Sequence, residues 1–162
     1  MLKDKKIIIT GGLGFLGYAI FNKLKQTNKL LIIDNFSTNT HNRNDINKHH
    51  NSKFIDIDIN SKTISKTFED FKPDIVIHCA AQTSVIDSIK NPSNTKRINI
   101  EGTKNILNGI KSLKKCFFIF ISSGGAIYGN PIYLPVDEKH QINPISTYGI
   151  SKNEGEILTK KI

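Results

Sequence analysis

A glycine-rich turn near the amino terminus constrains the fold of this 162-residue chain more than any other feature. An apolar run at residues 6–10 leads straight into the sequence GGLGFLG, which places Gly11, Gly14 and Gly17 three residues apart. The first glycine permits a tight turn, the second lets the backbone approach a pyrophosphate, and the third lets a helix pack against the strand. A helical pattern follows at residues 15–27. The turn is therefore typical of a dinucleotide-binding unit.

Strand-like and helix-like segments alternate along the rest of the chain. Apolar, β-branched runs stand at residues 6–10, 30–33, 54–57, 75–78 and 116–122, and helical patterns stand at residues 15–27, 61–71, 95–113 and 147–162. Because the apolar runs are nearly continuous, we expect strands buried on both faces, as in a parallel sheet covered by helices. The alternation predicts one α/β domain over residues 1–162, a Rossmann-type parallel sheet with helices on both faces that ends after the last helix. Residues 35–53 are expected to form a polar surface loop with a short helix.

Two acidic residues stand at predicted strand ends. Asp34 lies about twenty residues beyond the glycine turn, where a carboxylate can accept hydrogen bonds from the adenosine ribose hydroxyls and repels a 2′-phosphate. No arginine follows it immediately, so the sequence favours NAD over NADP. Asp58 is placed to approach the adenine, although its alternative role is that of a helix N-cap before Ser61. The first helical residues, Phe15 and Leu16, would present free N–H groups to the phosphates.

Tyr148 and Lys152 are four residues apart in the last helical pattern. This spacing places both side chains on one face of a helix, so the ammonium group can lie near the phenol. A nearby cation stabilises a phenolate, which can remove a hydroxyl proton while hydride leaves the carbon for a nicotinamide. The pair follows a serine-rich strand end at residues 121–125, which strengthens the interpretation as a catalytic pair.

Charge and polar residues outside these motifs indicate no other function. The formal net charge is +9, but the lysines are scattered and form no stripe with interleaved aromatic residues, which argues against nucleic-acid binding. His41, His49 and His50 lie in the polar loop without ligand-spaced partners, so we expect no metal site. Cys79 and Cys116 are expected to be buried free thiols. Without an apolar run of about 20 residues or a secretory leader, the sequence predicts a soluble, cytoplasmic protein with no membrane partner.

Further motifs are distributed over the chain. They are Asp34-Asn35-Phe36-Ser37-Thr38, Asp58-Ile59, HCAAQTS at residues 78–84, Asn99 with Gly102-Thr103, SSGGAIYG at residues 122–129, and LPVDE at residues 134–138. Together with the glycine turn and the tyrosine–lysine pair, they make the chain resemble the extended short-chain dehydrogenase/reductases. Within that family it is most similar to the nucleotide-sugar 4-epimerases of the UDP-glucose 4-epimerase type.

The resemblance implies a role for each matching position. Tyr148 would be the catalytic acid/base, and Lys152 would tune it and hydrogen-bond the nicotinamide ribose. The implied cofactor-binding residues are Gly11, Gly14, Phe15, Leu16, Gly17, Asp34, Asn35, Asp58, Ile59, Ala80, Ala81, Asn99, Tyr148 and Lys152. The family oxidises the sugar C4 hydroxyl with bound NAD and returns hydride to the opposite face. The resemblance also implies a UDP-hexose substrate and a homodimer formed through the helices that carry Asn99 and Tyr148.

The chain departs from the family pattern in two respects. A Ser or Thr that hydrogen-bonds the reacting hydroxyl is expected at the position of Gly124, and Ser123 is the candidate substitute. The alternative is that the Ser123 hydroxyl only caps the backbone at a strand end. Family members are about twice as long as one domain of this size, so we expect the C-terminal substrate-binding domain to be absent.

Three interpretations of the function stay open. The first is a nucleotide-sugar 4-epimerase, or its N-terminal half. The second is a non-catalytic NAD-binding module. The third is a related dehydratase, decarboxylase or reductase, although dehydratases usually carry Thr-Asp-Glu where this chain has Gly124-Gly125-Ala126.

Overall fold

A five-stranded parallel sheet forms the centre of the computed structural model, which describes residues 2–38, 41–113 and 115–161. The strand order is β3-β2-β1-β4-β5. The strands are β1 (Lys6–Thr10), β2 (Lys29–Asp34), β3 (Ser52–Asp56), β4 (Ile75–His78) and β5 (Phe117–Phe120). All neighbouring strands run parallel. The predicted α/β Rossmann-type fold is confirmed.

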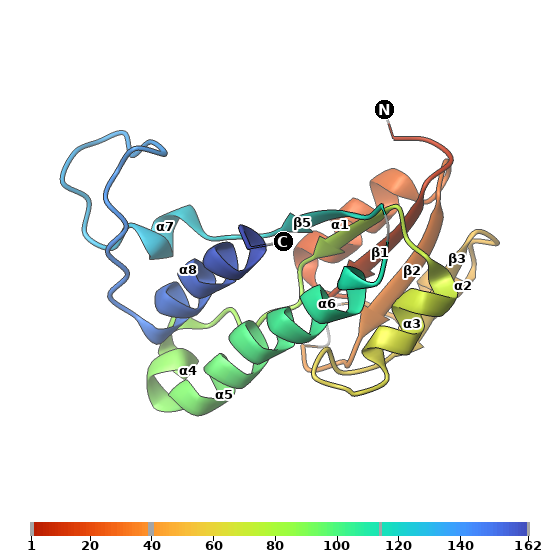
Figure 1. Ribbon diagram of the computed structural model, residues 1–162, viewed down its shortest axis with the longest axis horizontal. Helices are drawn as coiled ribbons and strands as arrows, with labels where there is room; N and C mark the ends of the chain where they lie inside the picture. Colours follow the sequence, from red (N-terminus) through yellow and green to blue (C-terminus); the bar gives the residue numbers. More distant parts are fainter. Residues whose placement is uncertain (1, 39–40, 114, 162) are drawn as a thin grey trace.

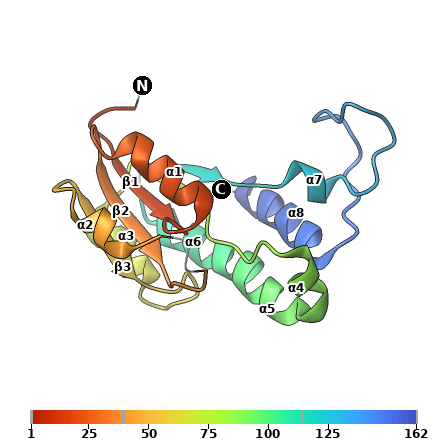
Figure 2. The same ribbon diagram turned by 180° about the vertical axis from the view of Figure 1, so that it is seen from behind.

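Helices cover both faces of the sheet (Figures 1 and 2). One face packs against α1 (Phe15–Leu24) and α2 (Arg43–Asn47), and its core includes Phe21, Ile46 and Ile9. The other face packs against α3 (Ile64–Phe71) and α6 (Gly102–Lys111), and its core is built from strand residues together with the buried side chains Ile64, Phe68, Ile106, Leu107 and Ile110. Alternate residues of β1 and β2 point to opposite faces, which explains why these strands are apolar throughout.

The strand order reverses after β3, and the point of reversal in the sheet lies between the neighbouring strands β1 and β4. Strands β1, β2 and β3 follow one another toward one edge, and β4 then returns to pair with the other side of β1. In open α/β sheets the ligand crevice lies at such a point, beyond the carboxyl ends of the strands. Thr10 and His78, the last residues of β1 and β4, are direct neighbours there.

The helix predicted at residues 95–113 corresponds to a composite helix in the structure. This composite helix consists of α5 (Pro92–Lys96), a π-helical turn η1 (Arg97–Glu101) and α6. The helix begins earlier than predicted because the Asn91 side chain accepts a hydrogen bond from Asn94 N and Pro92 occupies the first helical position. Insertions of π geometry into α-helices are frequently found at functional sites. This one contains Asn99, which the resemblance assigned to the cofactor site.

Other boundaries differ from the sequence prediction by a few residues. Helix α3 begins at Ile64 instead of residue 61, because Ser61 N donates to the carbonyl of Asp58 in a preceding turn. Strand β3 begins at Ser52, inside the segment expected to be a loop, and the short helix expected there is α2. Strand β5 is shorter than the predicted run at residues 116–122. The short helices α4 (Val85–Lys90) and α7 (Gly124–Ile127) were not predicted from the sequence.

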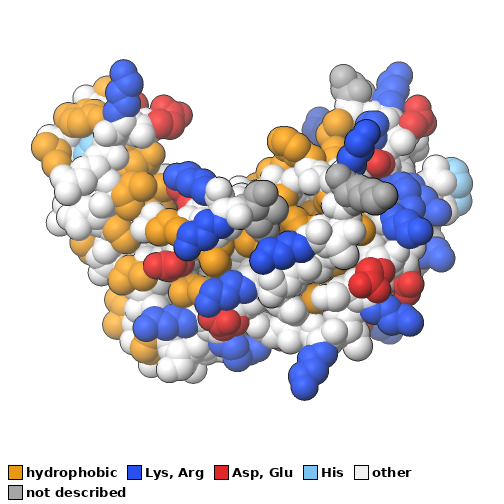
Figure 3. Space-filling view, in the orientation of Figure 1, with side chains coloured by type: hydrophobic (Ala, Val, Ile, Leu, Met, Phe, Trp, Pro, Cys, Tyr) orange, Lys and Arg blue, Asp and Glu red, His pale blue; other side chains and the backbone are white. Residues whose placement is uncertain are grey.

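Helices α4, α7 and α8 (Thr147–Thr159) lie beyond the carboxyl ends of the strands (Figure 1). Between α7 and α8, residues 128–146 form an arm that extends away from the sheet. Figure 3 shows the surface hollowed between this arm and the sheet, with hydrophobic side chains on the arm. Among them, Ile132 is 75% exposed and Leu134 is 77% exposed. Figure 3 also shows Lys and Arg side chains spread over this face, with no single basic stripe.

The cysteines are less buried than expected. Cys79 lies just past β4 and Cys116 just before β5, and both are free and half-buried. Burial raises the pKa of both thiols to about 11. In the described part of the chain, no three His, Cys, Asp or Glu side chains lie close enough together to hold a metal ion. None of the described helices is both long and apolar enough to cross a bilayer.

Candidate cofactor and active site

The glycine turn after β1 has a backbone that only glycine fits. Gly11 has φ +66, and a Cβ built on it would lie 2.6 Å from Ala80 N. A Cβ on Gly17 would collide with the carbonyl oxygen of Gly11, so the start of α1 packs directly on the turn. The close approach of Gly11 to Ala80 brings the segments that follow β1 and β4 together at the point where the strand order reverses.

The amino end of α1 is open to an anion. Its N-cap residue is Gly14, and among the described residues no side chain caps the helix. Phe15 is 83% exposed and Leu16 is 42% exposed, so the first helical turn lies at the surface. An uncapped helix start has free N–H groups and a partial positive charge, which favour a phosphate. The turn and the helix start therefore fit a pyrophosphate.

Asp34 at the end of β2 is tied to the glycine turn. Its carboxylate accepts hydrogen bonds from Leu13 N at 2.9 Å and from Phe36 N at 3.0 Å. The side chain is only 9% exposed. It therefore fixes the turn and the loop after β2 relative to each other. A carboxylate oxygen that accepts one hydrogen bond keeps a second lone pair, so the role expected for Asp34 toward a ribose is compatible with these contacts.

Asp58 lies in a polar cluster next to the end of β2. It accepts hydrogen bonds from Asn60 N at 2.8 Å and from Asn35 Nδ2 at 3.1 Å, and Arg97 lies 3.8 Å away. Burial acts to raise the pKa of Asp58, but these hydrogen bonds and the Arg97 charge outweigh it and lower the pKa below its usual value. The alternative role as a helix N-cap is wrong, because the N-cap of α3 is Thr63. The next residue, Ile59, is buried against Gly102.

Asn99 in the π-helical turn joins three segments. Its Oδ1 accepts from Gln82 N at 2.8 Å, and its Nδ2 donates to Gln82 O at 2.9 Å and to Ser151 Oγ at 2.9 Å. The side chain is 3% exposed. It thus fixes the loop after β4, which contains Ala80 and Ala81, relative to helix α8. These contacts give Asn99 a role in holding the site together. Its place beside the cofactor stays a prediction.

Helix α8, which carries Tyr148, is anchored at its first turn. Ser146 caps it by accepting from Gly149 N at 3.0 Å. The fully buried Ser88 of α4 accepts from Tyr148 N at 3.1 Å. Ser151, held by Asn99, donates to the Tyr148 carbonyl at 2.7 Å. The N–H of Tyr148 is therefore held by α4, and its carbonyl is held by Ser151 of the same helix, which Asn99 of η1 binds in turn. The Tyr148 side chain is half-buried.

Lys152, one turn after Tyr148, is almost completely buried. The side chain is 5% exposed, and Nζ lies over the Phe120 ring at 4.4 Å from its centroid. Burial lowers the pKa of Lys152 to about 8, and the nearby Cys79 and Glu156 oppose this shift. Cys79 follows β4 and Phe120 ends β5, so the ammonium lies at the carboxyl ends of these two strands. This is the edge of the sheet where Gly11 meets Ala80.

Ser123 and Gly124 stand at the start of α7. Ser123 is the N-cap residue, but its hydroxyl makes no capping hydrogen bond to the helix, so the capping alternative is not observed. A Cβ built on Gly124 meets nothing within 4 Å. The position where a Ser or Thr was expected is therefore open, and the neighbouring Ser123 hydroxyl is not committed to α7.

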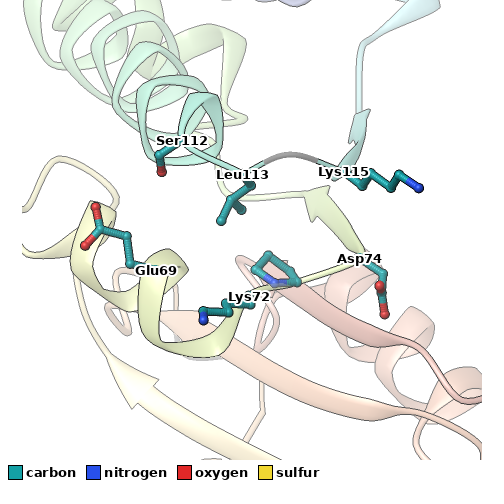
Figure 4. Close-up of a pocket in the computed structure, with 7 residues that line it drawn as sticks. Glu69, Lys72, Asp74, Ser112, Leu113 and Lys115 are labelled. Carbon is teal, nitrogen blue, oxygen red and sulfur yellow. The ribbon is translucent and has the colours of Figure 1, made fainter.

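A pocket at the other end of the sheet does not belong to this site. It is lined by residues from the carboxyl ends of α3 and α6 and from the segments just before β4 and β5, namely Glu69, Lys72, Pro73, Asp74, Ser112, Leu113 and Lys115. Figure 4 shows its charged side chains pointing in different directions, without converging on one point. The glycine turn lies at the opposite edge of the sheet, so this pocket has no part in the candidate chemistry.

Three of the side chains that help to hold the site together were not predicted from the sequence. Ser88, Arg97 and Ser151 carried no motif signal of their own, because their partners are far away in the sequence. Gln82 lay within the HCAAQTS motif, but its function here depends on its backbone groups, which any residue type has. Only the motif around it could have drawn attention to that loop.

Comparison with known proteins agrees with this geometry. The model of the NAD dependent epimerase/dehydratase family matches residues 7–162. A Methanocaldococcus jannaschii protein provisionally named UDP-glucose 4-epimerase is 44% identical over 155 residues, which are 95% of this chain and 50% of that protein. The chain thus spans about half the length of this relative.

Two solved structures are also similar to this chain over nearly its whole length, and the chain again covers about half of each of them. The UDP-N-acetylglucosamine 4-epimerase from Methanobrevibacter ruminantium M1, in complex with UDP-N-acetylmuramic acid, has a TM-score of 0.90 and 33% identity, covering 99% of this chain and 51% of that one. The complex of the Thermus thermophilus UDP-glucose 4-epimerase with NAD has a TM-score of 0.86 and 29% identity, covering 96% of this chain and 50% of that one. The family model matches nearly all the described residues, and the fold has the glycine turn of a dinucleotide-binding site. The chain therefore belongs to the NAD-dependent epimerase/dehydratase family.

Proposed function

We propose that this chain is the NAD-binding part of a nucleotide-sugar 4-epimerase that acts on a UDP-hexose. One observation carries the proposal: the buried Lys152, one turn after Tyr148, lies at the carboxyl ends of β4 and β5, where Gly11 also meets Ala80. A dinucleotide bound along the glycine turn would extend toward this pair. The relatives named as UDP-sugar 4-epimerases support the choice of substrate class.

The residues present fit NAD. The space at Gly11 and Gly17 that a Cβ would fill is taken up by the close backbone of the turn, and the start of α1 would face the pyrophosphate of a bound NAD. Asp34, Asn35 and Asp58 form the polar end where an adenosine would lie, and Ala80 and Ala81 would line the middle. The NAD complex of the Thermus thermophilus relative supports this assignment.

Bound NAD supplies a hydride acceptor that can return the hydride to the same carbon from either face of a sugar. Tyr148 would take the proton from the C4 hydroxyl and give it back. The Lys152 ammonium, held beside β4 and β5, would stabilise the phenolate form of the tyrosine. Ser123 would donate a hydrogen bond to the reacting oxygen, in the open space that Gly124 leaves.

A dehydratase is the second candidate within the same family, which is named for both epimerases and dehydratases. Elimination of water needs an additional acid and base near the sugar. The sequence Gly124-Gly125-Ala126 supplies no carboxylate at the start of α7, and for this reason we favour the epimerase.

Proton NMR of UDP-glucose or UDP-galactose incubated with NAD and the pure chain tests the proposal. Inversion at C4 that is lost in Tyr148→Phe supports an epimerase. NAD binding without turnover would support the competing interpretation, a non-catalytic NAD-binding module. A 4-keto-6-deoxy product would instead identify a dehydratase.

We also propose that the chain forms a homodimer through the helices that carry Asn99 and Tyr148. Ile150 on α8 is 44% exposed, and Ile86 and Ile89 on the adjacent α4 are 65% and 67% exposed. Light scattering tests this, because a dimer mass that becomes monomeric in Ile150→Asp is the expected result. A monomeric mass for the unaltered chain would contradict it.

A further inference from the structure

His78, the last residue of β4, has no role in the chemistry proposed above, yet it is 1% exposed at the centre of the site. Both ring nitrogens have hydrogen-bond partners. Nδ1 lies 2.6 Å from Thr10 Oγ1 at the end of β1, and Nε2 lies 3.0 Å from Thr103 Oγ1 in α6. The ring therefore connects the strand before the glycine turn to the helix that follows the π-helical turn.

The neighbours of Thr103 fix the proton on one side of the ring. Thr103 Oγ1 lies 2.6 Å from the carbonyl oxygen of Asn99. A carbonyl can only accept, so the hydroxyl must donate its proton to Asn99 and must accept from His78. His78 Nε2 therefore carries a hydrogen.

The other side of the ring is fixed in the same way. Burial, aided by the Lys152 charge, lowers the pKa of His78 to about 3, so the ring is neutral near pH 7. With its one proton on Nε2, Nδ1 must accept a hydrogen bond from Thr10. The Thr10 hydroxyl in turn accepts from Ala80 N at 3.3 Å. All donors along this chain point the same way, from Ala80 to Asn99.

Both ends of this hydrogen-bonded chain belong to the candidate site. Ala80 is the residue that Gly11 touches. Asn99 holds the backbone of Gln82 and the hydroxyl of Ser151, and Ser151 donates to the carbonyl of Tyr148. A continuous set of hydrogen bonds therefore links the loop beside the glycine turn to the helix that carries Tyr148.

We propose that His78, in its neutral Nε2–H form, is a positioning residue that sets Asn99, and through it the Tyr148 helix, relative to the glycine turn. If the chain binds NAD, as proposed above, its NAD affinity should depend on this hydrogen-bond network, so this consequence rests on the proposed function. A histidine that merely filled the core would leave Asn99 and Tyr148 in place when the Thr103 hydroxyl is removed. The response of these two residues to that removal separates the two cases.

The hydroxyl of Thr103 can be removed almost without a change of shape. Thr103→Val removes it, while Thr103→Ser keeps it. Thr67→Val is the matched control, because Thr67 Oγ1 also donates to a carbonyl one helical turn earlier, that of Thr63, but on α3 away from the site. We expect NAD to bind Thr103→Val roughly tenfold more weakly by isothermal titration calorimetry, and the other two variants within about twofold of the unaltered chain.

Nitrogen-15 NMR of the histidine rings provides a readout that needs no cofactor. In the unaltered chain near pH 7, His78 should show a hydrogen on Nε2 and none on Nδ1. In Thr103→Val, the signals of the Asn99 side-chain amide and the Tyr148 backbone amide should shift, and in Thr67→Val they should not.

Three results would overturn the inference: an Nδ1–H or doubly protonated His78, unchanged Asn99 and Tyr148 signals in Thr103→Val, or unchanged NAD affinity in that variant. If the unaltered chain binds no NAD, the proposed function fails, but the NMR signals still decide whether His78 couples the two segments. The ring spectrum of the unaltered chain decides the tautomer even if Thr103→Val does not fold.

Discussion

Lys152 carries its charge in surroundings that oppose it. An ammonium group prefers water, but this one lies against the Phe120 ring and is 5% exposed. The cation–π contact with the Phe120 ring compensates only part of the hydration free energy that the buried ammonium loses. Such a placement makes sense where the charge serves chemistry, because strongly shifted groups gather at functional sites.

The lowered pKa of Lys152 has a consequence for stability. In the folded chain it is about 8, against 10.5 for the ordinary value, so the unfolded chain binds more protons between these pH values. The free energy of unfolding should therefore rise with pH through this window, by up to about 3 kcal/mol relative to Lys152→Met, and the difference should be constant below pH 8. Urea denaturation at several pH values measures it, with the exposed Lys160→Met as control. A difference that does not change with pH would contradict the burial of the charge.

Gly11 is the position where the turn tolerates no side chain. Gly11→Ala should destabilise the chain by about 2 kcal/mol or more, because an alanine is strained at φ +66 and its Cβ would contact Ala80 N. Gly125→Ala is the matched control: a Cβ there meets nothing within 4 Å, and alanine favours a helix. Thermal unfolding compares the two variants, and equal melting temperatures would show that the turn is not constrained as described.

Contacts with other elements help to position the amino end of helix α8. Ser146 caps it, Ser88 of α4 receives Tyr148 N, and the Asn99–Ser151 pair holds the Tyr148 carbonyl. The Tyr148–Lys152 spacing predicted from the sequence placed both residues on one helix, and this is what the structure has. The sequence could not show what anchors that helix, because Ser88 lies sixty residues away.

Ser88→Ala removes one of these anchors. We expect it to lower the free energy of unfolding by about 1 kcal/mol, the usual net contribution of one hydrogen bond. It should also weaken turnover more than NAD binding, since Tyr148 is the residue displaced. Ser93→Ala, on the exposed side of α5, is the control and should change neither. Chemical denaturation measures the stability, calorimetry measures the NAD affinity, and proton NMR of a UDP-hexose measures the turnover; equal effects of both substitutions would contradict the anchoring role.

At the scale of the whole molecule, the sequence predicted the order of the five strands and of the longer helices, but not α4 or α7, and it predicted the edge of the sheet where the site lies. The continuous apolar runs and the glycine turn were enough for that, because strand burial and tight turns depend on neighbouring residues. The π-helical turn around Asn99 and the Asn35–Asp58–Arg97 cluster could not be predicted, because they form from residues that meet only in the folded chain. The arm at residues 128–146 likewise carries no periodic pattern that would place it.

NAD binding to the pure chain, measured by isothermal titration calorimetry, tests the central claim most directly. We predict saturable binding of one NAD per chain, weaker binding of NADP because Asp34 would face the added phosphate, and loss of NAD binding in Gly11→Ala with Gly125→Ala unaffected. No binding by the folded chain, or equal binding by Gly11→Ala, would contradict it.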